Sequence, residues 1–130
     1  DAFFPLATLD KYYLPYFAQV GPSLATLDRL MSFPAEIYVP AHGHPSAEIT
    51  EALKANKQRL QEVTELVLSI LTEPLSREEI VAHFCREKSI DSSYSQYFLA
   101  TAAITAHLTY LDEQGLIKPK VAAGVLKWHR

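Results

Sequence analysis

A short turn around His42 is the part of the sequence with the clearest potential for metal chemistry. Residues 37–39 form a brief β-favouring run, and Pro40 ends it. Ala41 and Gly43 flank His42 with almost no side chain, so the backbone can turn sharply and present the imidazole to a cleft. Because neutral imidazole is the commonest protein ligand for zinc, the turn predicts a metal-binding histidine. The alternative is an ordinary loop histidine, which is the commoner role of a histidine beside glycine.

The remaining histidines and the single cysteine have weaker signals. His44 follows in the same turn, where it would either orient a metal ligand, line a cleft or be a solvated loop residue. His83 and His107 fall on predicted helices, where packing or surface roles are the usual ones. Cys85 follows Phe84 on a predicted helix, which favours a buried and inert thiol over a reactive one.

The composition predicts a cytoplasmic globular protein. The chain has 130 residues, 48% of them hydrophobic, which is enough for one ordinary domain or two small ones. No apolar run approaches the roughly 18 residues of a membrane span, and no signal peptide is visible. A net charge of -3 gives no general attraction to nucleic acid or anionic membranes. One cysteine excludes an internal disulfide and fits a reducing compartment.

Residues 1–45 are predicted to be the end of a larger domain. The segment is rich in aromatic residues and proline, with a helix predicted over residues 23–31 and a lone strand over residues 36–39. One helix and one strand cannot bury their own apolar faces. The aromatic run at residues 12–17 would pack against the rest of that domain or line a substrate cleft. The chain also opens on Asp1 without an initiator methionine, which suggests a piece of a longer protein.

Residues 46–72 are predicted to form one long linking helix that is also the first helix of the next domain. Ser46 is the expected N-cap, and Pro74 ends the helix. Apolar residues recur at alternating steps of four and three, which makes one continuous stripe. Asn56 is the single polar member of the stripe, and we expect it to fix register or to lie at the solvent edge.

Residues 73–130 are predicted to form a small domain of winged-helix type. Ser76 and Glu79 make a capping box, and Leu75 and Ile80 make a hydrophobic staple that starts a helix of about three turns. The next helix covers residues 93–113. Its candidate N-caps are Asp91, Ser92 and Ser93, its inward residues are Tyr97, Thr101, Ile104, Leu108 and Leu111, and Gly115 ends it. Residues 116–121 and 125–128 then form a β-hairpin.

The N-terminal part of the sequence resembles the C-terminal end of a metallo-β-lactamase-fold hydrolase. The resemblance lies in Asp1-Ala2-Phe3-Phe4, in the helix over residues 23–31, and in Val39-Pro40-Ala41-His42-Gly43, where Ala41 replaces a more usual glycine. It implies that Asp1 and His42 are metal ligands of a two-zinc site in an αββα sandwich. The long helix and the winged-helix-like extension resemble the branch of lactamase-like endoribonucleases and related ester or thioester hydrolases. The expected fold is therefore mainly α with minor β.

The sequence departs from that family in a way that bears on activity. The H-x-H-x-D-H motif is absent, and the five histidines nowhere have its spacing. A catalytic zinc site needs about three protein ligands and an open position for water. We therefore assign no catalytic residue within this chain and expect neither tightly bound zinc nor activity from the chain alone. Its expected partner is the missing N-terminal part of the same protein, and the substrate would be a small ester or thioester, or RNA.

The alternative function is a nucleic-acid-binding or dimerisation module without catalysis. The helix over residues 93–113 contains no Lys or Arg, which argues against sequence-specific binding to duplex DNA. Its bare apolar surface would instead suit a homodimer. The hairpin carries a modest basic wing that would touch RNA or a nucleotide, or would be a solvated strand face. The wing residues are Lys118, Lys120, Lys127 and Arg130.

Overall fold

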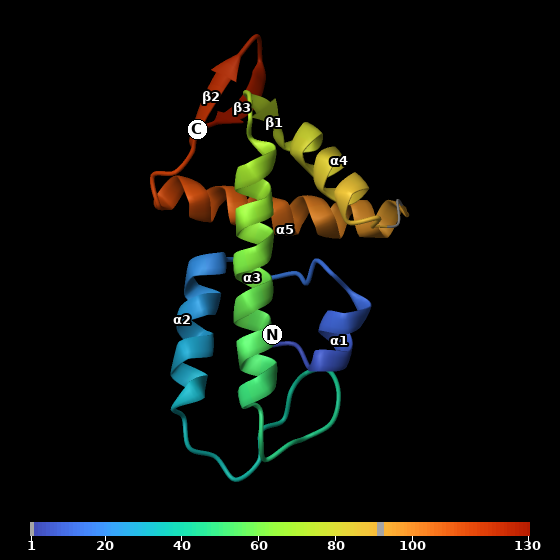
Figure 1. Ribbon diagram of the computed structural model, residues 1–130, viewed down its shortest axis with the longest axis vertical. Helices are drawn as coiled ribbons and strands as arrows, with labels where there is room; N and C mark the ends of the chain where they lie inside the picture. Colours follow the sequence, from blue (N-terminus) through green and yellow to red (C-terminus); the bar gives the residue numbers. More distant parts are fainter. Residues whose placement is uncertain (1, 91–92) are drawn as a thin grey trace.

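The computed structural model describes residues 2–90 and 93–130, and they are mainly helical with one small sheet (Figure 1). The order of elements is α1 (Leu6–Lys11), α2 (Val20–Met31), α3 (Thr50–Ile70), β1 (Leu75–Ser76), α4 (Arg77–Glu87), α5 (Tyr94–Glu113), β2 (Lys118–Ala122) and β3 (Val125–His129). The expectation of a mainly α fold with minor β is confirmed. Helix α3 is the central rod, with α1 and α2 along its first half and α4, α5 and the sheet around its second half.

The apolar stripe of α3 joins two hydrophobic clusters. Leu53 and Leu60 pack with residues of the N-terminal segment and α2, whereas Val63 and Val67 pack with α4 and α5. All four side chains are buried, so the predicted stripe is confirmed. Burying such a side chain contributes about 1.5–3 kcal/mol, and the clusters therefore anchor both halves of the chain on α3.

The start of the long helix differs from the prediction. Helix α3 begins at Thr50, and Ser46 is not its N-cap. Instead, the Ser46 main chain pairs with Tyr38 through two hydrogen bonds of 2.8 and 3.0 Å. Hydrogen bonds from the side chain and the amide of Thr50 to the carboxylate of Glu48, the amide one at 2.6 Å, lower the pKa of Glu48. They place a negative charge at the helix start.

The lone strand predicted over residues 36–39 is wrong. Among the described residues before α3, extended pairing is confined to the Tyr38–Ser46 bridge. Residues 2–45 contribute no named strand to a sheet, and α1 and α2 pack on α3 instead. Helix α2 also starts earlier than predicted, at Val20. Pro22 is compatible with this start, because it lies in the first turn, where its missing amide removes no helical hydrogen bond.

The capping box that starts α4 is confirmed. The Ser76 hydroxyl accepts from the Glu79 amide at 3.3 Å, and the Glu79 carboxylate accepts from the Ser76 amide at 2.7 Å. The Ser76 amide and, at 2.8 Å, the Ser76 hydroxyl both donate to this carboxylate, which lowers the pKa of Glu79. Leu75 and Ile80 are buried in one cluster, as a staple requires.

The C-terminal sheet has one strand more than predicted. Strand β1 pairs with β3, so the three antiparallel strands lie in the order β1-β3-β2. The hairpin itself is confirmed with a tighter turn. Ala122 pairs with Val125 across Ala123 and Gly124, whose φ values are 50° and 76°. Two residues with positive φ are typical of a type I′ turn, which matches the twist of the strands.

Helix α5 begins and ends where the sequence predicts. Ser93 caps its start through a hydrogen bond from the Gln96 amide, while Asp91 and Ser92 lie outside the described residues. Gly115, with φ of 72°, ends it in a Schellman motif. Of the predicted inward residues, Ile104, Leu108 and Leu111 are buried and Thr101 is partly buried. Tyr97 is not inward, because it is 41% exposed and the smaller Ala100 faces the core instead.

Candidate functional site

The His42 turn packs directly on the N-terminal segment. Gly43 has a φ of +90°, and a Cβ at this position would lie 2.9 Å from Cγ of Pro5. Both the backbone conformation and the close approach therefore require glycine. The prediction of a sharp turn that depends on Gly43 is confirmed, and the turn holds an exposed His42 above residues 2–5.

The ring of Phe4 lies next to the ring of His42. The two rings are nearly parallel, at 9°, with centroids 6.2 Å apart. Phe4 is itself buried and meets Phe17 edge to face at 5.1 Å. Ala2 and His42 line the same hollow of about 480 Å³. Asp1, the other predicted ligand, lies outside the described residues.

Asn56 fixes the position of Phe4. Its side-chain oxygen accepts from the Phe4 amide at 2.9 Å, and its side-chain nitrogen donates to the Phe4 carbonyl at 2.7 Å. The same nitrogen donates to the Ala52 carbonyl at 2.7 Å. Asn56 is fully buried, so the solvent-edge alternative is wrong, and its bonds to Phe4 fix the N-terminal segment on α3. The signal in the sequence was its place as the one polar member of an apolar stripe.

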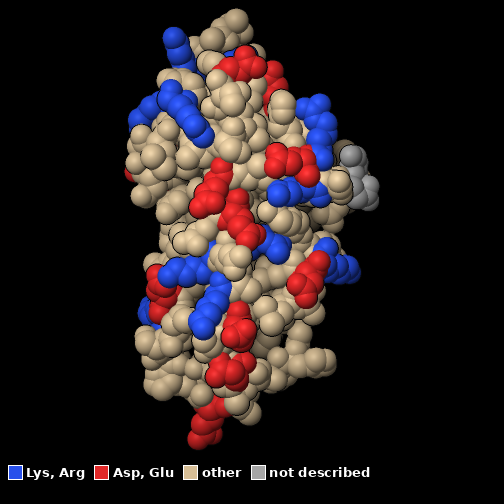
Figure 2. Space-filling model, viewed as in Figure 1, with Lys and Arg blue, Asp and Glu red and all other residues tan. Residues whose placement is uncertain are grey.

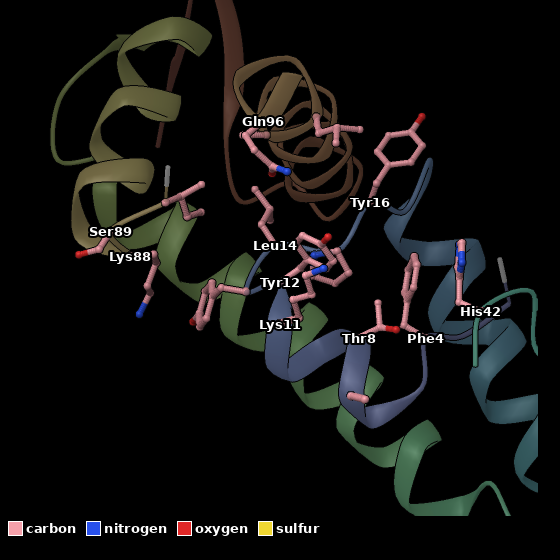
Figure 3. Close-up of a pocket in the computed structure, with 16 residues that line it drawn as sticks. Phe4, Thr8, Lys11, Tyr12, Leu14, Tyr16, His42, Lys88, Ser89 and Gln96 are labelled. Atoms are coloured by element: carbon pink, nitrogen blue, oxygen red, sulfur yellow. The ribbon is translucent and has the colours of Figure 1, made fainter. Parts of the chain in front are cut away.

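A groove with a volume of about 810 Å³ leads away from His42 (Figure 3). It runs between α1, the aromatic segment after it, the end of α4 and the first turns of α5. In Figure 3, His42 and Phe4 lie at one end, while Lys88 and Ser89 lie at the other. The predicted aromatic run therefore has two roles, because Tyr12, Tyr13 and Tyr16 line the groove and Phe17 is in the core.

Arg59 of α3 holds the aromatic segment in place. Its Nη1 donates to the carbonyls of Leu9, Tyr12 and Tyr13 at 3.2, 3.2 and 2.8 Å. Its guanidinium carbon also lies 4.5 Å from the centre of the Tyr13 ring. Carbonyls at the end of α1 would otherwise lack partners, and a planar guanidinium satisfies several at once. Sequence analysis did not single out this residue.

The other histidines lie away from His42 or face solvent. His44 is exposed and lines neither of the two hollows, and His83 is exposed on α4. His107 is buried on α5, where its Nδ1 lies 2.8 Å from the Thr64 hydroxyl. Because that hydroxyl donates its one proton to the Leu60 carbonyl, Nδ1 of His107 carries a proton and donates. Burial lowers the pKa of His107 to about 4, so the ring is neutral at pH 7.

The described residues do not by themselves fit a catalytic metal site. Across residues 2–90 and 93–130, no group of three or more His, Cys, Asp or Glu side chains could hold a metal ion. A catalytic zinc site needs about three protein ligands. Of the two predicted ligands, only His42 is among the described residues. No reaction step can therefore be derived through a metal on these side chains alone.

The basic wing is largely engaged with the protein itself. Lys118 pairs with Asp112 at 2.8 Å, Lys127 donates to the Pro74 carbonyl at 3.4 Å, and Arg130 donates to the Leu68 carbonyl. On the face shown in Figure 2, basic and acidic side chains are interspersed, so this face has no extended field of one sign. Binding to a polyanion depends on such a field.

No helix in the described part of the chain combines the length and the apolarity needed to cross a bilayer.

Comparison with known proteins finds similar solved structures. No protein-family model matches the sequence, and no curated protein matches it. The chain is similar to a solved metallo-beta-lactamase family protein from Thermus thermophilus, with 27% identity and a TM-score of 0.63. It is also similar in fold to a beta-lactamase domain protein from Burkholderia ambifaria, with 21% identity and a TM-score of 0.62. Each match covers 83% of this chain and 32% of the solved one, so the chain spans about a third of those proteins.

Proposed function

We propose that this chain is the C-terminal part of a cytoplasmic, metal-dependent hydrolase of the metallo-β-lactamase superfamily. Asp1 and His42 would be ligands of a two-zinc site whose other ligands lie outside these 130 residues. The observation that carries the proposal is the likeness to metallo-beta-lactamase family structures over 83% of the chain. The single cysteine supports the compartment. Bound zinc would ionise a water molecule and polarise the substrate in the intact enzyme.

The placement of His42 supports its role as a ligand. The turn presents the imidazole at the lip of a groove of enzyme-like size, and Gly43 and Phe4 fix the turn from two sides. Ala2 lines the same hollow as His42, which agrees with a ligand contributed by the start of the chain. His44 would line the cleft or orient its neighbour.

The second part of the proposal is the division of the chain. Residues 1–45 would end the catalytic domain, residues 46–72 would link, and residues 73–130 would form a winged-helix-like accessory domain. The supporting observations are the order of the end of α3, β1, α4, α5, β2 and β3, and the sheet order β1-β3-β2. Helix α5 has no Lys or Arg, so sequence-specific duplex DNA is not the expected ligand. The substrate would be a small ester or thioester, or RNA.

The coding sequence before Asp1 and the metal content of the intact protein test the proposal together. An H-x-H-x-D-H motif is expected upstream. In that intact protein, His42→Ala should lower bound zinc and abolish hydrolysis, while His83→Ala, on the exposed face of α4, should change neither. The 130-residue chain alone should bind zinc weakly and turn over no ester, thioester or phosphodiester. Submicromolar zinc binding by the chain alone, or turnover that His42→Ala abolishes there, would contradict the proposal.

A second candidate function is self-association through α5. Tyr94 is 81% exposed and Phe98 is 54% exposed, and the same face continues through Ala102, Thr105 and Thr109 without a charge. The hydroxyls of Thr105 and Thr109 donate to carbonyls one turn earlier, at 2.7 and 3.1 Å, which leaves their methyl groups for contact. The face is therefore apolar although its sequence looks polar.

The second candidate would pair this face with the same face of a second copy. In an antiparallel pair centred between Thr101 and Ala102, Phe98 would meet Thr105 and Tyr94 would meet Thr109. Each ring would face a small residue, and such a two-fold contact closes on itself. Sedimentation of the chain at increasing concentration tests the candidate. Thr105→Glu should abolish the dimer, Ala82→Glu on the exposed face of α4 should not, and a wild-type monomer at all concentrations would exclude it.

A further inference from the structure

Among the described residues that line the groove, two are lysines. Within residues 2–90 and 93–130, the lining contains Lys11 and Lys88 but no Asp or Glu. Neither lysine forms an ion pair with a described residue, although α4 and α3 carry carboxylates that pair elsewhere. The chain has a net charge of -3, so two lysines and no carboxylate among the described lining residues make the groove locally more positive than the chain as a whole.

Aromatic rings hold both ammonium groups beside the groove. Nζ of Lys11 lies 5.0 Å from the centre of the Tyr12 ring, and Nζ of Lys88 lies 4.7 Å from the centre of the Tyr13 ring. A ring face attracts a cation but does not neutralise it, so each ammonium retains its capacity to bind an anion. Arg59 of α3 contacts the Tyr13 ring and donates to the Tyr13 carbonyl. These contacts hold the ring over which Lys88 lies.

The rest of the lining is apolar or uncharged. Phe4, Leu14 and Leu99 contribute apolar surface, and Thr8, Ser89 and Gln96 contribute groups that form hydrogen bonds without charge. In Figure 3 the two lysines lie between the middle and one end of the groove, and His42 lies at the other end. The site is therefore long, with an apolar body, a cationic part and a histidine at the far end.

We propose that this groove binds an organic anion, namely a compound with an aromatic or acyl body and a phosphate or carboxylate group that Lys11 and Lys88 bind. The inference rests on the proposed function in that it takes the groove as the substrate side of the hydrolase. It narrows the substrate to an anionic ester or thioester that places its anion at the lysines and its scissile bond towards His42. The apolar walls stack against the body, and the lysines select for the charge.

The test separates binding from hydrolysis and needs no metal. Titrations of the 130-residue chain would use 1-naphthyl phosphate, 1-naphthoate, neutral 1-naphthol and inorganic phosphate, followed by calorimetry and amide chemical shifts. We expect both naphthyl anions to bind more tightly than naphthol or phosphate alone, with shifts at Thr8, Gln96 and Leu99. The ratio of the two anions identifies the preferred group. Lys11→Met or Lys88→Met should weaken anion binding about 5- to 10-fold and leave naphthol unchanged.

A control lysine outside the groove shows whether the effect belongs to Lys11 and Lys88. Lys54→Met removes an exposed lysine of α3 that does not line the groove, and it should leave all affinities unchanged. Equal binding of naphthol and naphthyl phosphate, or an unchanged affinity in Lys88→Met, would overturn the proposal. Tighter, Lys88-dependent binding of single-stranded RNA than of either naphthyl anion would also overturn it. The titrations contain no zinc and measure binding alone. Their result therefore does not depend on whether the parent protein is a hydrolase.

Discussion

Asn56 and Phe4 are 52 positions apart in the chain, and they exchange two hydrogen bonds as paired strands do. The amide side chain of a helix residue thus takes the place of a neighbouring strand for one residue of the N-terminal segment. Because Phe4 lies against both Phe17 and His42, this bond pair determines where the candidate ligand lies. A buried residue of α3 therefore positions the candidate site.

Replacement of Asn56 by leucine should destabilise the chain strongly. The variant keeps the volume but leaves the Phe4 amide and carbonyl buried without partners, which we expect to cost about 2–4 kcal/mol of the free energy of unfolding. Urea denaturation measures the loss. Gln58→Leu, on the exposed side of the same helix, is the control and should change stability little. A loss in Asn56→Leu no greater than in the control would contradict the role.

Gly43→Ala should lower the free energy of unfolding more than Gly124→Ala does, although both glycines have positive φ. Gly124 has a φ of +76° and no atom within 4 Å of a built Cβ, so alanine there adds backbone strain of about 1 kcal/mol. At Gly43 the new methyl group also meets the rigid Pro5 ring at 2.9 Å. The difference between the two losses, measured by urea denaturation, isolates the contact. Equal losses would show that the turn is not held against Pro5.

Acid should weaken the fold through His107. Its folded-state pKa of about 4 lies below the ordinary 6.5, so the unfolded chain binds a proton first and stability falls as the pH drops through this window. We expect a loss of about 2 kcal/mol between pH 7 and pH 4.5 from this residue. His107→Gln should flatten the dependence, and the exposed His83→Gln should not. Indistinguishable pH curves for wild type and His107→Gln would contradict the assignment.

Substitutions at the ends of α4 and α5 should change stability in opposite directions. Ser89 ends α4 as Gly115 ends α5, with the same two backbone hydrogen bonds and positive φ, 50° and 72°. Ser89→Gly should stabilise the chain by up to about 1 kcal/mol, and Gly115→Ala should destabilise it by about 1 kcal/mol. Thermal denaturation of both variants gives the signs. A loss of stability in Ser89→Gly would mean that its side chain contributes more than its backbone costs.

Arg59→Lys should loosen the aromatic segment. A lysine keeps the charge but lacks the planar guanidinium that lies over the Tyr13 ring, and its side chain ends before the position of Nη1. We therefore expect a loss of about 1–2 kcal/mol together with faster amide exchange in residues 9–13. The matched change Arg29→Lys, on the exposed face of α2, should be neutral. Unchanged exchange in residues 9–13 would show that the segment is held by other contacts.

Features encoded within a few residues could be predicted from the sequence. The Ser76–Glu79 capping box, the Gly115 stop and the hairpin each depend on neighbours in the chain, and the structure contains all three. The start of α3 could not be placed, because Ser46 has a stronger alternative in its pairing with Tyr38. Helix propensities and capping preferences describe neighbours in the sequence, so they do not include a pairing partner such as Tyr38.

The candidate site was predictable only in part. The small residues around His42 indicated the turn, whereas its contact with Phe4 depends on Asn56 across the molecule. The groove needs α1, the end of α4 and the start of α5 to meet, and no local pattern specifies that meeting. Arg59 was missed for the same reason, since its three acceptors lie 46 to 50 positions away.

Helix α3 has a consequence for how the chain melts. Its stripe passes from Leu60 in one cluster to Val63 in the other within a single turn, so neither cluster can lose the helix without exposing the other. Heating should therefore give one all-or-none transition in which the calorimetric and van't Hoff enthalpies agree. In a longer protein the same helix would act mechanically as a rigid strut, because a tilt of its first turns beside α2 would displace the C-terminal sheet at its other end (Figure 1).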